Sequence, residues 1–343
     1  MPKKIAVNTL LFISACFFSL FVIELGLRFF WKTTVHPVKL QSIGTQSDGR
    51  KIHTLVPNDT YVNREGIRVR TNALGFRDIE HDVTNKSKDR IIFFGDSFTH
   101  ATALNEEERL SSRIRQQLKN DFPGKYEVFN MGVSGNNIQQ NLDLIKHFSP
   151  IIKPDVVVIA YVLNDVLIDD GHFSKVVGMP IGQELKESLN ENLALYRFLN
   201  FSAGQLYKIF IEKNARLRTH HESRQKATIS SYMDSSKNYK NLKRKFSTIR
   251  QLGLSGDFKI LVINWPMFDD ETDDDYPYTE AHEKIKELSE GNDFNYLDLF
   301  GTFYGLEGKT LWVSEEDHHP NSLANKLAFK TAYPALKSLL HSH

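Results

Sequence analysis

Two short segments, more than two hundred residues apart, carry side chains that can do chemistry together. Ser97 lies in Gly95-Asp96-Ser97-Phe98, and His319 lies in Asp317-His318-His319-Pro320-Asn321. A serine hydroxyl is a weak nucleophile until a neighbouring base takes its proton. Such a pair performs acyl transfer through an ester formed on the serine. The triplet Gly-Asp-Ser alone is a weak signal, because the same residues form many ordinary turns.

The residues around His319 predict how such a base is oriented. Pro320 biases the residue before it toward an extended backbone. In an extended chain, residues two apart share a face and neighbours point to opposite sides. Asp317 and His319 are therefore expected to face together, with His318 turned away. A carboxylate in this place orients the imidazole and stabilises its charged form, which makes Asp317 the candidate acid.

The elements that must position these side chains are those of an α/β fold. Short apolar runs predict buried strands over residues 91–94, 126–130, 156–161, 260–264 and 296–299. Apolar side chains four apart predict helices over 106–118 and 136–148, and a last helix begins at Pro320-Asn321. Strands that alternate with helices indicate a parallel sheet covered on both faces. Sites in such sheets lie at the carboxyl ends of the strands, where the strand order reverses.

Four short blocks in this chain resemble those of the SGNH (GDSL) hydrolase superfamily. They occur in the family's order, as Gly95-Asp96-Ser97-Phe98, Asn130-Met131-Gly132-Val133-Ser134-Gly135, Tyr161-Val162-Leu163-Asn164-Asp165 and Asp317-His318-His319-Pro320-Asn321. The resemblance runs from about Arg90 to the C-terminus, with a long insertion unmatched. It implies a three-layer α/β/α fold with a five-stranded, flavodoxin-like parallel sheet.

The resemblance also implies an oxyanion hole. In the family, a glycine N–H of the second block and the asparagine amide of the third donate to the developing oxyanion. Gly132 and Asn164 are the candidates here, together with the N–H of Ser97. Each such donor is worth about 2.7–4 kcal/mol in the transition state. Structural roles remain open, because glycine permits tight turns and asparagine caps helices.

Several positions depart from the family pattern or leave alternatives open. Many members carry the acid three residues before the histidine, which here is Glu316, so the acid is either Asp317 or Glu316. Val162 stands where the third block usually begins with glycine, and we expect it to narrow the acyl pocket. His100 either lines the pocket or packs inside the fold. No metal or organic cofactor is implied, and the acidic run 269–275 lacks the glycine and spaced ligands of an EF-hand loop.

The first 32 residues differ in composition from the rest. Lys3 and Lys4 precede a mainly apolar run of 19 residues, 5–23, and a spanning helix needs roughly 17–25. A cleaved secretory signal has a core of roughly 7–15 apolar residues and a small-x-small site. We therefore predict an uncleaved signal anchor over 1–32. Because Ile13-Ser14-Ala15-Cys16 resembles a lipoprotein cleavage box, lipidation of Cys16 remains an alternative.

Beyond the anchor, the sequence divides into a linker and N-terminal extension (33–89) and an SGNH hydrolase-like domain (90–343) with an insertion at about 170–255. Residues 60–62 and 67–71 can form short strands. The segment Asn72-Ala73-Leu74-Gly75-Phe76-Arg77 is similar to one that precedes the first block in membrane-anchored members, and the sequence supplies no mechanism for it. The insertion is a helical cap, a lid over the site, or a surface resting on anionic lipid headgroups.

The charges and the single cysteine limit which partners and which membrane orientation are expected. A net charge of +1 offers no basic stripe for nucleic acid. A single cysteine excludes an intramolecular disulfide, and no feature indicates an oligomeric state. Lys3, Lys4 and the amino terminus outweigh Arg28 and Lys32 mildly, which favours a cytoplasmic N-terminus. The protein is then a single-pass protein of the inner (cell) membrane, with its catalytic domain periplasmic or extracellular.

These features together predict a membrane-anchored serine esterase. Its expected substrates are O-acyl groups, acetyl among them, on envelope glycans or lipids. An O-acyltransferase that modifies a cell-envelope polysaccharide with the same residues is one alternative. A non-catalytic envelope binding protein is the other, although four intact blocks argue against a decayed site.

Overall fold

The computed structural model describes residues 2–30, 40–63, 66–167, 193–196, 198–199, 202, 216–268, 272–315 and 317–341. The chain forms two compact units. The first unit consists of Met1–Val35 and Asp170–Ser223, and the second consists of His36–Asp169 and Arg224–His343. The second unit holds all four sequence blocks. Most of the first half of the predicted insertion lies outside the described residues.

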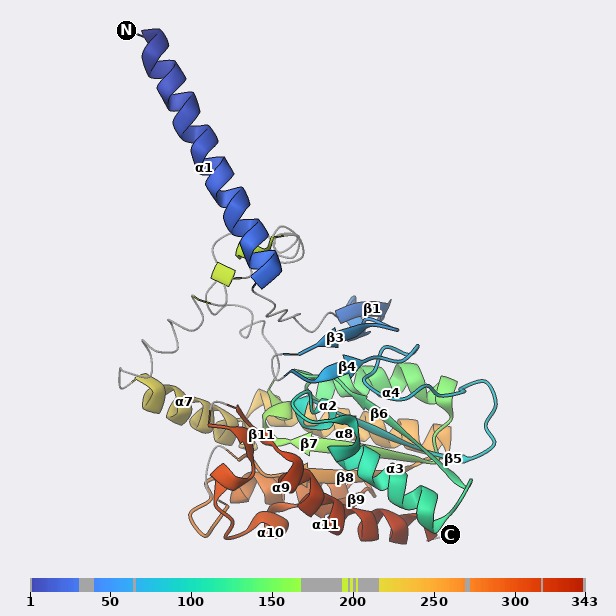
Figure 1. Ribbon diagram of the computed structural model, residues 1–343. Coiled ribbons are helices and arrows are strands. Elements are labelled where there is room, and N and C mark those ends of the chain that lie inside the picture. The colour runs from blue at the N-terminus through green and yellow to red at the C-terminus, as the bar shows by residue number, and fades with distance from the viewer. Residues whose placement is uncertain are drawn as a thin grey trace. The chain divides into compact units, whose positions relative to one another are not determined.

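A five-stranded parallel sheet forms the centre of the second unit (Figure 1). Its strands are β5 (Asp89–Gly95), β6 (Tyr126–Gly132), β7 (Val156–Val162), β8 (Lys259–Trp265) and β9 (Asn295–Asp298), in the order β6-β5-β7-β8-β9. This order is that of flavodoxin-like sheets, with the reversal between β5 and β7. The predicted parallel α/β fold is therefore confirmed, and the site is expected where β5 and β7 end.

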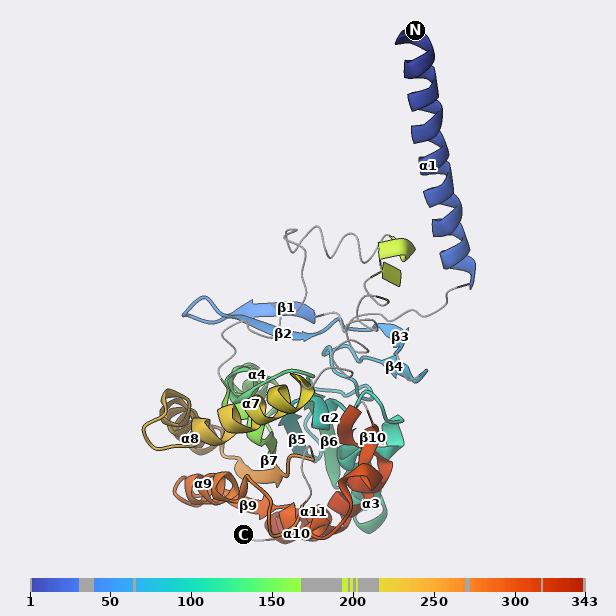
Figure 2. The ribbon, with the colours of Figure 1, turned by 90° about the vertical axis from the view of Figure 1, so that its left-hand side faces the viewer.

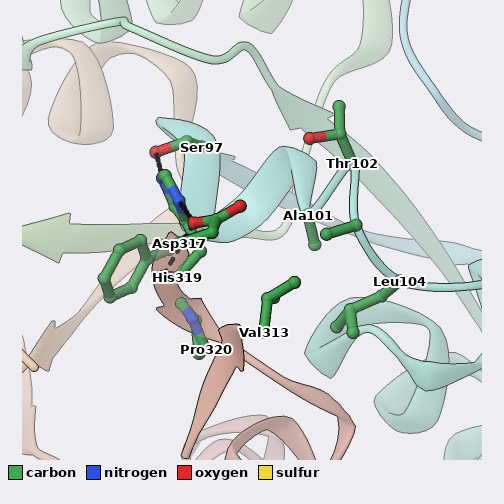
Figure 3. Close-up of a pocket in the computed structure, with 10 residues that line it drawn as sticks. Ser97, Ala101, Thr102, Leu104, Val313, Asp317, His319 and Pro320 are labelled. Carbon is green, nitrogen blue, oxygen red and sulfur yellow. Dashed lines mark hydrogen bonds and ion pairs between the residues drawn. The ribbon is translucent and has the colours of Figure 1, made fainter. Parts of the chain in front are cut away.

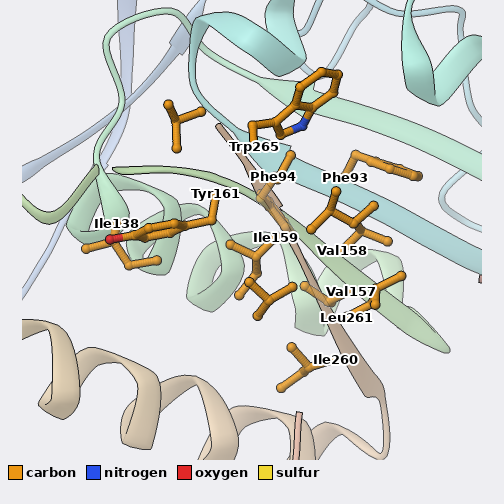
Figure 4. Packing of buried hydrophobic residues seen from close by; sticks show 14 of the residues in the cluster. Phe93, Phe94, Ile138, Val157, Val158, Ile159, Tyr161, Ile260, Leu261 and Trp265 are labelled. Atoms are coloured by element: carbon orange, nitrogen blue, oxygen red, sulfur yellow. The ribbon is translucent and has the colours of Figure 1, made fainter. Parts of the chain in front are cut away.

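The strands form because their side chains are apolar on both faces. All seven residues of β7 are buried, as parallel strands between two helical layers require. Figure 4 shows how Phe93, Phe94, Val158 and Ile159 pack beside Trp265 in this core.

Helices cover both faces of the sheet (Figure 2). On one side α3 (Leu110–Asp121) packs with α11 (Ser322–His341), and on the other α4 (Ile138–Ile152) packs with α8 (Lys237–Gly256), which also contacts α9 (Thr279–Glu290). The helix α4 begins where predicted, because the Asn137 side chain accepts from the N–H groups of Gln139 and Gln140. Shorter or partly described helices are α2 (Ser97–His100), α7 (Arg216–Ser231) and α10 (Phe300–Phe303), with 3-10 turns η1 (Glu106–Glu108), η2 (Leu163–Val166) and η4 (Gly308–Thr310).

The N-terminal extension belongs to the same compact unit as the sheet. It forms two antiparallel ribbons, β1 (Leu40–Thr45) with β2 (Lys51–Leu55) and β3 (Thr60–Val62) with β4 (Arg68–Arg70). Ile52, Leu55 and Phe76 are buried in the main core. The extension is thus a packed part of the domain. A third ribbon joins β10 (Trp312–Ser314) to β11 (Asp317–Pro320).

The first unit contains α1 (Pro2–Phe30). Its stretch Leu11–Phe29 is long and apolar enough to cross a membrane, a test that a signal sequence also passes. The Glu24 carboxylate accepts from the backbone N–H groups of Ala194 and Leu195, at 2.9 and 2.8 Å, and from Arg28. β1 begins at Leu40, ten residues after the end of α1.

Candidate active site

Ser97 is the first residue of α2, and Asp96 alone separates it from the end of β5. Asp96 forms the N-cap of this helix, because its carboxylate accepts from the Phe98 N–H at 2.9 Å. Gly95 is required for close packing: a Cβ there would lie 2.2 Å from Thr99 Oγ1 and 2.8 Å from the Ala160 carbonyl. The Gly-Asp-Ser triplet is therefore a tight strand-to-helix turn that places a serine at the carboxyl edge of the sheet.

His319 reaches Ser97 from the ribbon β10–β11. Its Nε2 lies 2.8 Å from Ser97 Oγ, and its Nδ1 contacts Asp317 Oδ1 (Figure 3). The same carboxylate oxygen accepts from the His319 N–H at 3.1 Å. Burial opposes the ionisation of Asp317, but the hydrogen bond and charge attraction to His319 outweigh it and lower the pKa of the carboxyl.

His318, between these two residues on β11, makes contacts of its own. The His318 ring stacks on Trp312, with a centroid separation of 3.8 Å, and its Nε2 lies 3.2 Å from the Glu315 carbonyl oxygen. Glu316, the alternative acid, is outside the described residues. The structure thus brings Ser97, His319 and Asp317 together.

Asn164 lies in the 3-10 turn η2, directly after β7 and beside the reversal of strand order. Within the described part of the chain, its buried Oδ1 has no hydrogen-bond partner. The Tyr232 hydroxyl donates to the Leu163 carbonyl and lies 2.7 Å from the Tyr161 hydroxyl. These bonds fix the turn, and they connect it to a residue that lies between α7 and α8.

The second block contains two glycines in different environments. Gly132 is buried at the end of β6, and its N–H donates to Asn130 Oδ1 at 3.0 Å. A Cβ at Gly132 would lie 2.5 Å from the His100 nitrogen, so glycine allows α2 to pack against β6. Gly135 is exposed, with φ +82°, and its N–H donates to no group of the described chain. Of the two glycines, Gly135 is therefore the one whose N–H is uncommitted within the described chain.

A small pocket opens beside the serine and histidine (Figure 3). It is lined by Ser97, Phe98, Ala101, Thr102, Ala103, Leu104, Val313, Asp317, His319 and Pro320. Most of these side chains are small or apolar. Val162 is buried at the end of β7 and is not among them, so the expectation that it narrows the pocket is wrong for this pocket.

His100 is a packing residue, which was one of the two interpretations of the sequence. It is fully buried, it does not line the pocket, and its Nδ1 lies 2.7 Å from Ser134 Oγ. Burial, with the nearby charges of Arg77 and Arg109, lowers the pKa of His100 to about 3. The imidazole is therefore neutral and connects the end of α2 to the loop that contains Gly135.

Two features of this edge of the sheet have no simple sequence signal. Asp96 and Asp165 are both buried, and desolvation raises the pKa of each carboxyl, well above its usual value for Asp165. A second histidine–carboxylate contact joins His282 Nδ1, on α9, to Asp298, at the end of β9, at 2.9 Å. Since His282 is buried, this contact is structural. Within the described ranges, no three His, Cys, Asp or Glu side chains gather as a metal site.

Solved structures of several esterases are similar to this chain. The acetyl xylan esterase AlAXEase is 17% identical, over 72% of this chain and 99% of its own, with a TM-score of 0.43. The psychrotrophic esterase EstA from Pseudoalteromonas sp. is 12% identical, over 74% and 100%, with a TM-score of 0.43. The acetylxylan esterase Axe2 from Geobacillus stearothermophilus is 15% identical, over 72% and 94%, with a TM-score of 0.41. No curated protein sequence matches this chain.

The model of the GDSL-like Lipase/Acylhydrolase family matches residues 93–327, which is more than half of the chain. All four blocks named from the sequence fall inside this range. The match confirms the predicted family and the predicted enzyme class, an SGNH/GDSL-type esterase. The chain therefore belongs to the GDSL-like lipase/acylhydrolase family.

Proposed function

We propose that this esterase cleaves acyl esters through Ser97, His319 and Asp317, and that its substrates are O-acyl groups of envelope glycans or lipids. The observation that carries the proposal is the contact between Ser97 Oγ and His319 Nε2, at 2.8 Å, with Asp317 on the other ring nitrogen. This is the arrangement of nucleophile, base and orienting acid that activates a serine.

In the proposed reaction, His319 Nε2 takes the proton of Ser97 as Oγ bonds to the ester carbonyl carbon. The carbonyl oxygen becomes an oxyanion. When the intermediate collapses, the ester C–O bond breaks and the alcohol leaves with the proton from Nε2. Water then repeats the sequence on the acyl-serine, releasing the carboxylic acid. Asp317 keeps Nδ1 protonated and stabilises the imidazolium formed in each half.

The oxyanion is proposed to bind the N–H of Ser97, the amide of Asn164 and one N–H of the second block. The family resemblance suggested Gly132 for the last of these. Because the Gly132 N–H already donates to Asn130, we assign this role to Gly135, whose N–H is uncommitted. Asn164 would donate through its Nδ2, because Oδ1 is an acceptor and cannot bind an oxyanion.

The pocket favours a short acyl chain. Small and apolar side chains, Ala101, Ala103, Leu104 and Val313, line the space beside Ser97, and they suit an acetyl group better than a long fatty acyl chain. The envelope as the place of action rests on the apolar helix α1, which we propose anchors the enzyme in the inner membrane with the catalytic unit outside the cytoplasm.

The proposal is tested on the full-length chain in detergent micelles. Wild type should be labelled by a fluorophosphonate and should hydrolyse nitrophenyl acetate faster than nitrophenyl octanoate. Ser97→Ala should lose the label and reduce kcat by at least a thousandfold. Equal labelling and equal rates in the two proteins would remove the enzyme proposal.

The same assay separates hydrolysis from transfer. With an oligosaccharide added, an esterase releases free acid, whereas an O-acyltransferase yields acylated sugar at the expense of free acid. A protein that binds oligosaccharide without either product would match the third alternative, an envelope binding protein.

A further inference from the structure

One wall of the pocket has an unusual backbone. Ala101 ends the short helix α2 in the left-handed conformation, with φ +48° and ψ +56°, while its N–H donates to the Ser97 carbonyl at 2.8 Å. Residues with a Cβ rarely adopt this conformation, because the Cβ crowds the following carbonyl oxygen. Such a residue persists only where its surroundings hold it. Ala101 begins the stretch 101–104 that lines the pocket.

The side chain that holds this stretch comes from the N-terminal extension. Arg77 is 3% exposed, and its guanidinium donates to the carbonyls of His100 (3.3 Å), Ala101 and Leu104 (2.5 Å). Asn63, also of the extension, donates to the Thr102 carbonyl at 2.5 Å. Four of the five carbonyls from residue 100 to residue 104 thus bind side chains of the extension.

Arg77 is itself fixed by a compact turn. The Asn72 carboxamide accepts from the N–H groups of Leu74 and Phe76, at 3.1 and 3.0 Å. Gly75 has φ +79°, and a Cβ there would lie 2.5 Å from the Leu55 carbonyl, so only glycine fits. Phe76 is fully buried in the core. The turn leaves Arg77 one arrangement, directed at the end of α2.

A second buried arginine supports the first. Arg109, which is 1% exposed, donates to the Arg77 carbonyl at 2.5 Å. The five donors of a guanidinium form a planar fork that a lysine ammonium cannot reproduce. The fork bridges carbonyls on both sides of Ala101 and therefore opposes any rotation of this residue out of the left-handed conformation.

We propose that Arg77 is a positioning residue of the active site, which holds Ala101 left-handed and thereby fixes Ser97 and the pocket wall. Through the contact of His100 with Ser134, the same clamp reaches the loop of Gly135. Arg77 lies outside the residues matched by the family model. The inference rests on the proposed function, because the geometry that Arg77 maintains is that of the proposed nucleophile.

A double-mutant cycle tests the local cause. In the full-length protein, Arg77→Met should lower kcat for nitrophenyl acetate by roughly ten- to a hundredfold, with a smaller change in KM. Adding Ala101→Gly should raise the kcat of the Arg77→Met variant by about five- to thirtyfold. This factor corresponds to the cost of a left-handed residue with a Cβ. In the wild-type background, Ala101→Gly should give no comparable gain.

Arg70→Met is the matched control, since Arg70 is exposed on β4 of the same extension. It should leave kcat within twofold of wild type. Two outcomes overturn the inference. One is that the effects of Arg77→Met and Ala101→Gly simply multiply. The other is that the activity lost in Arg77→Met equals the fraction unfolded in thermal melts. Should Arg77→Met fail to fold, Arg77→Lys keeps the charge without the fork and takes its place in the cycle.

Hydrogen exchange supplies a measurement that needs no activity. The N–H groups of His100 and Ala101 donate to the carbonyls of Asp96 (3.0 Å) and Ser97 (2.8 Å). Peptides that cover them should exchange at least tenfold faster in the Arg77 variant and unchanged in Arg70→Met. Unchanged exchange in both overturns the inference. Faster exchange in the Arg77 variant, together with a wild type that hydrolyses no ester, would support the clamp and remove the proposed function.

Discussion

The imidazole of His319 lies between two oxygen atoms, Ser97 Oγ at Nε2 and Asp317 Oδ1 at Nδ1. Phe98 packs against the edge of this ring, with centroids 5.6 Å apart. Polar contacts at both ring nitrogens and the contact with Phe98 thus orient the ring. The carboxylate contact is the one whose loss should change the chemistry without changing the packing.

Asp317→Asn is therefore expected to lower kcat by about 10²–10⁴-fold, because an amide in this place favours the wrong tautomer of the histidine. Ester hydrolysis by the full-length protein measures it. Glu316→Gln is the matched variant, and its kcat should stay within a few-fold of wild type. A larger loss in Glu316→Gln than in Asp317→Asn would make Glu316 the acid.

A second prediction at this scale concerns pH and stability. The pKa of His100 is about 3 in the folded protein, against about 6.5 when unfolded. Between these values the unfolded chain binds a proton that the folded chain does not. The contribution of His100 to the free energy of unfolding is therefore fully present above about pH 6.5. Below this pH it decreases by about 1.4 kcal/mol per pH unit.

His100→Asn, which keeps a partner for Ser134, removes this contribution. Urea melts between pH 4 and pH 7 should show a pH dependence that is shallower than that of wild type by about this slope. Parallel curves for the two proteins would show that the buried imidazole does not control the acid sensitivity.

At the scale of elements, the site depends on how closely α2 approaches β6. A methyl group on Gly132 would meet two backbone atoms, His100 N at 2.5 Å and Thr99 C at 2.7 Å. Backbone atoms cannot rotate away as a flexible side chain can. Space at Gly132 therefore sets the distance of the nucleophile helix from the sheet.

Gly132→Ala should lower the free energy of unfolding by about 1–3 kcal/mol, as other over-packed sites do, and should lower kcat as α2 moves. Gly301→Ala is the control, because a Cβ at this exposed position of α10 meets nothing within 4 Å. It should be neutral or slightly stabilising. Urea melts that show equal changes in the two variants would contradict the packing argument.

The five sheet strands were predictable because strands buried on both faces are continuous apolar runs, as residues 156–161 show. The ends of those strands then located Ser97 and Asn164. The ribbon β1–β2 was not predicted, since β1 is mostly exposed and gives no sustained alternation. The bonds of Gly132 with Asn130 and of Arg77 with the end of α2 were also missed. Each of these bonds joins a side chain to a backbone atom, and such a bond produces no periodic pattern of residue types in the sequence.

For the whole molecule, the fate of α1 decides where the enzyme works. Length and hydropathy fit either an anchor or a signal sequence. The Glu24 carboxylate, however, accepts from the N–H groups of Ala194 and Leu195, which are 170 and 171 residues further along. Removal of α1 would leave these two backbone groups without this partner. We therefore expect α1 to be retained.

Intact-mass measurement of the protein purified from membranes should give the mass of the full chain. Glu24→Gln should keep that mass and increase protease cleavage near residue 194, because a neutral amide is a weaker acceptor than a carboxylate. A mass that corresponds to loss of the first 25–35 residues would show that α1 is a signal sequence. A mass that begins at Cys16 with added lipid would support the lipoprotein alternative.

Nine residues separate α1 from β1, and with α1 as the proposed membrane anchor they limit how far the catalytic unit can lie from it. A fully stretched chain of this length covers about 35 Å. An enzyme on so short a connection stays within a thin layer next to the membrane. It meets membrane-bound substrates at a rate set by their lateral diffusion and their surface density. Its turnover of membrane-bound acyl esters in a cell would then follow their number per unit area of membrane, whereas soluble acyl sugars would still reach it by free diffusion.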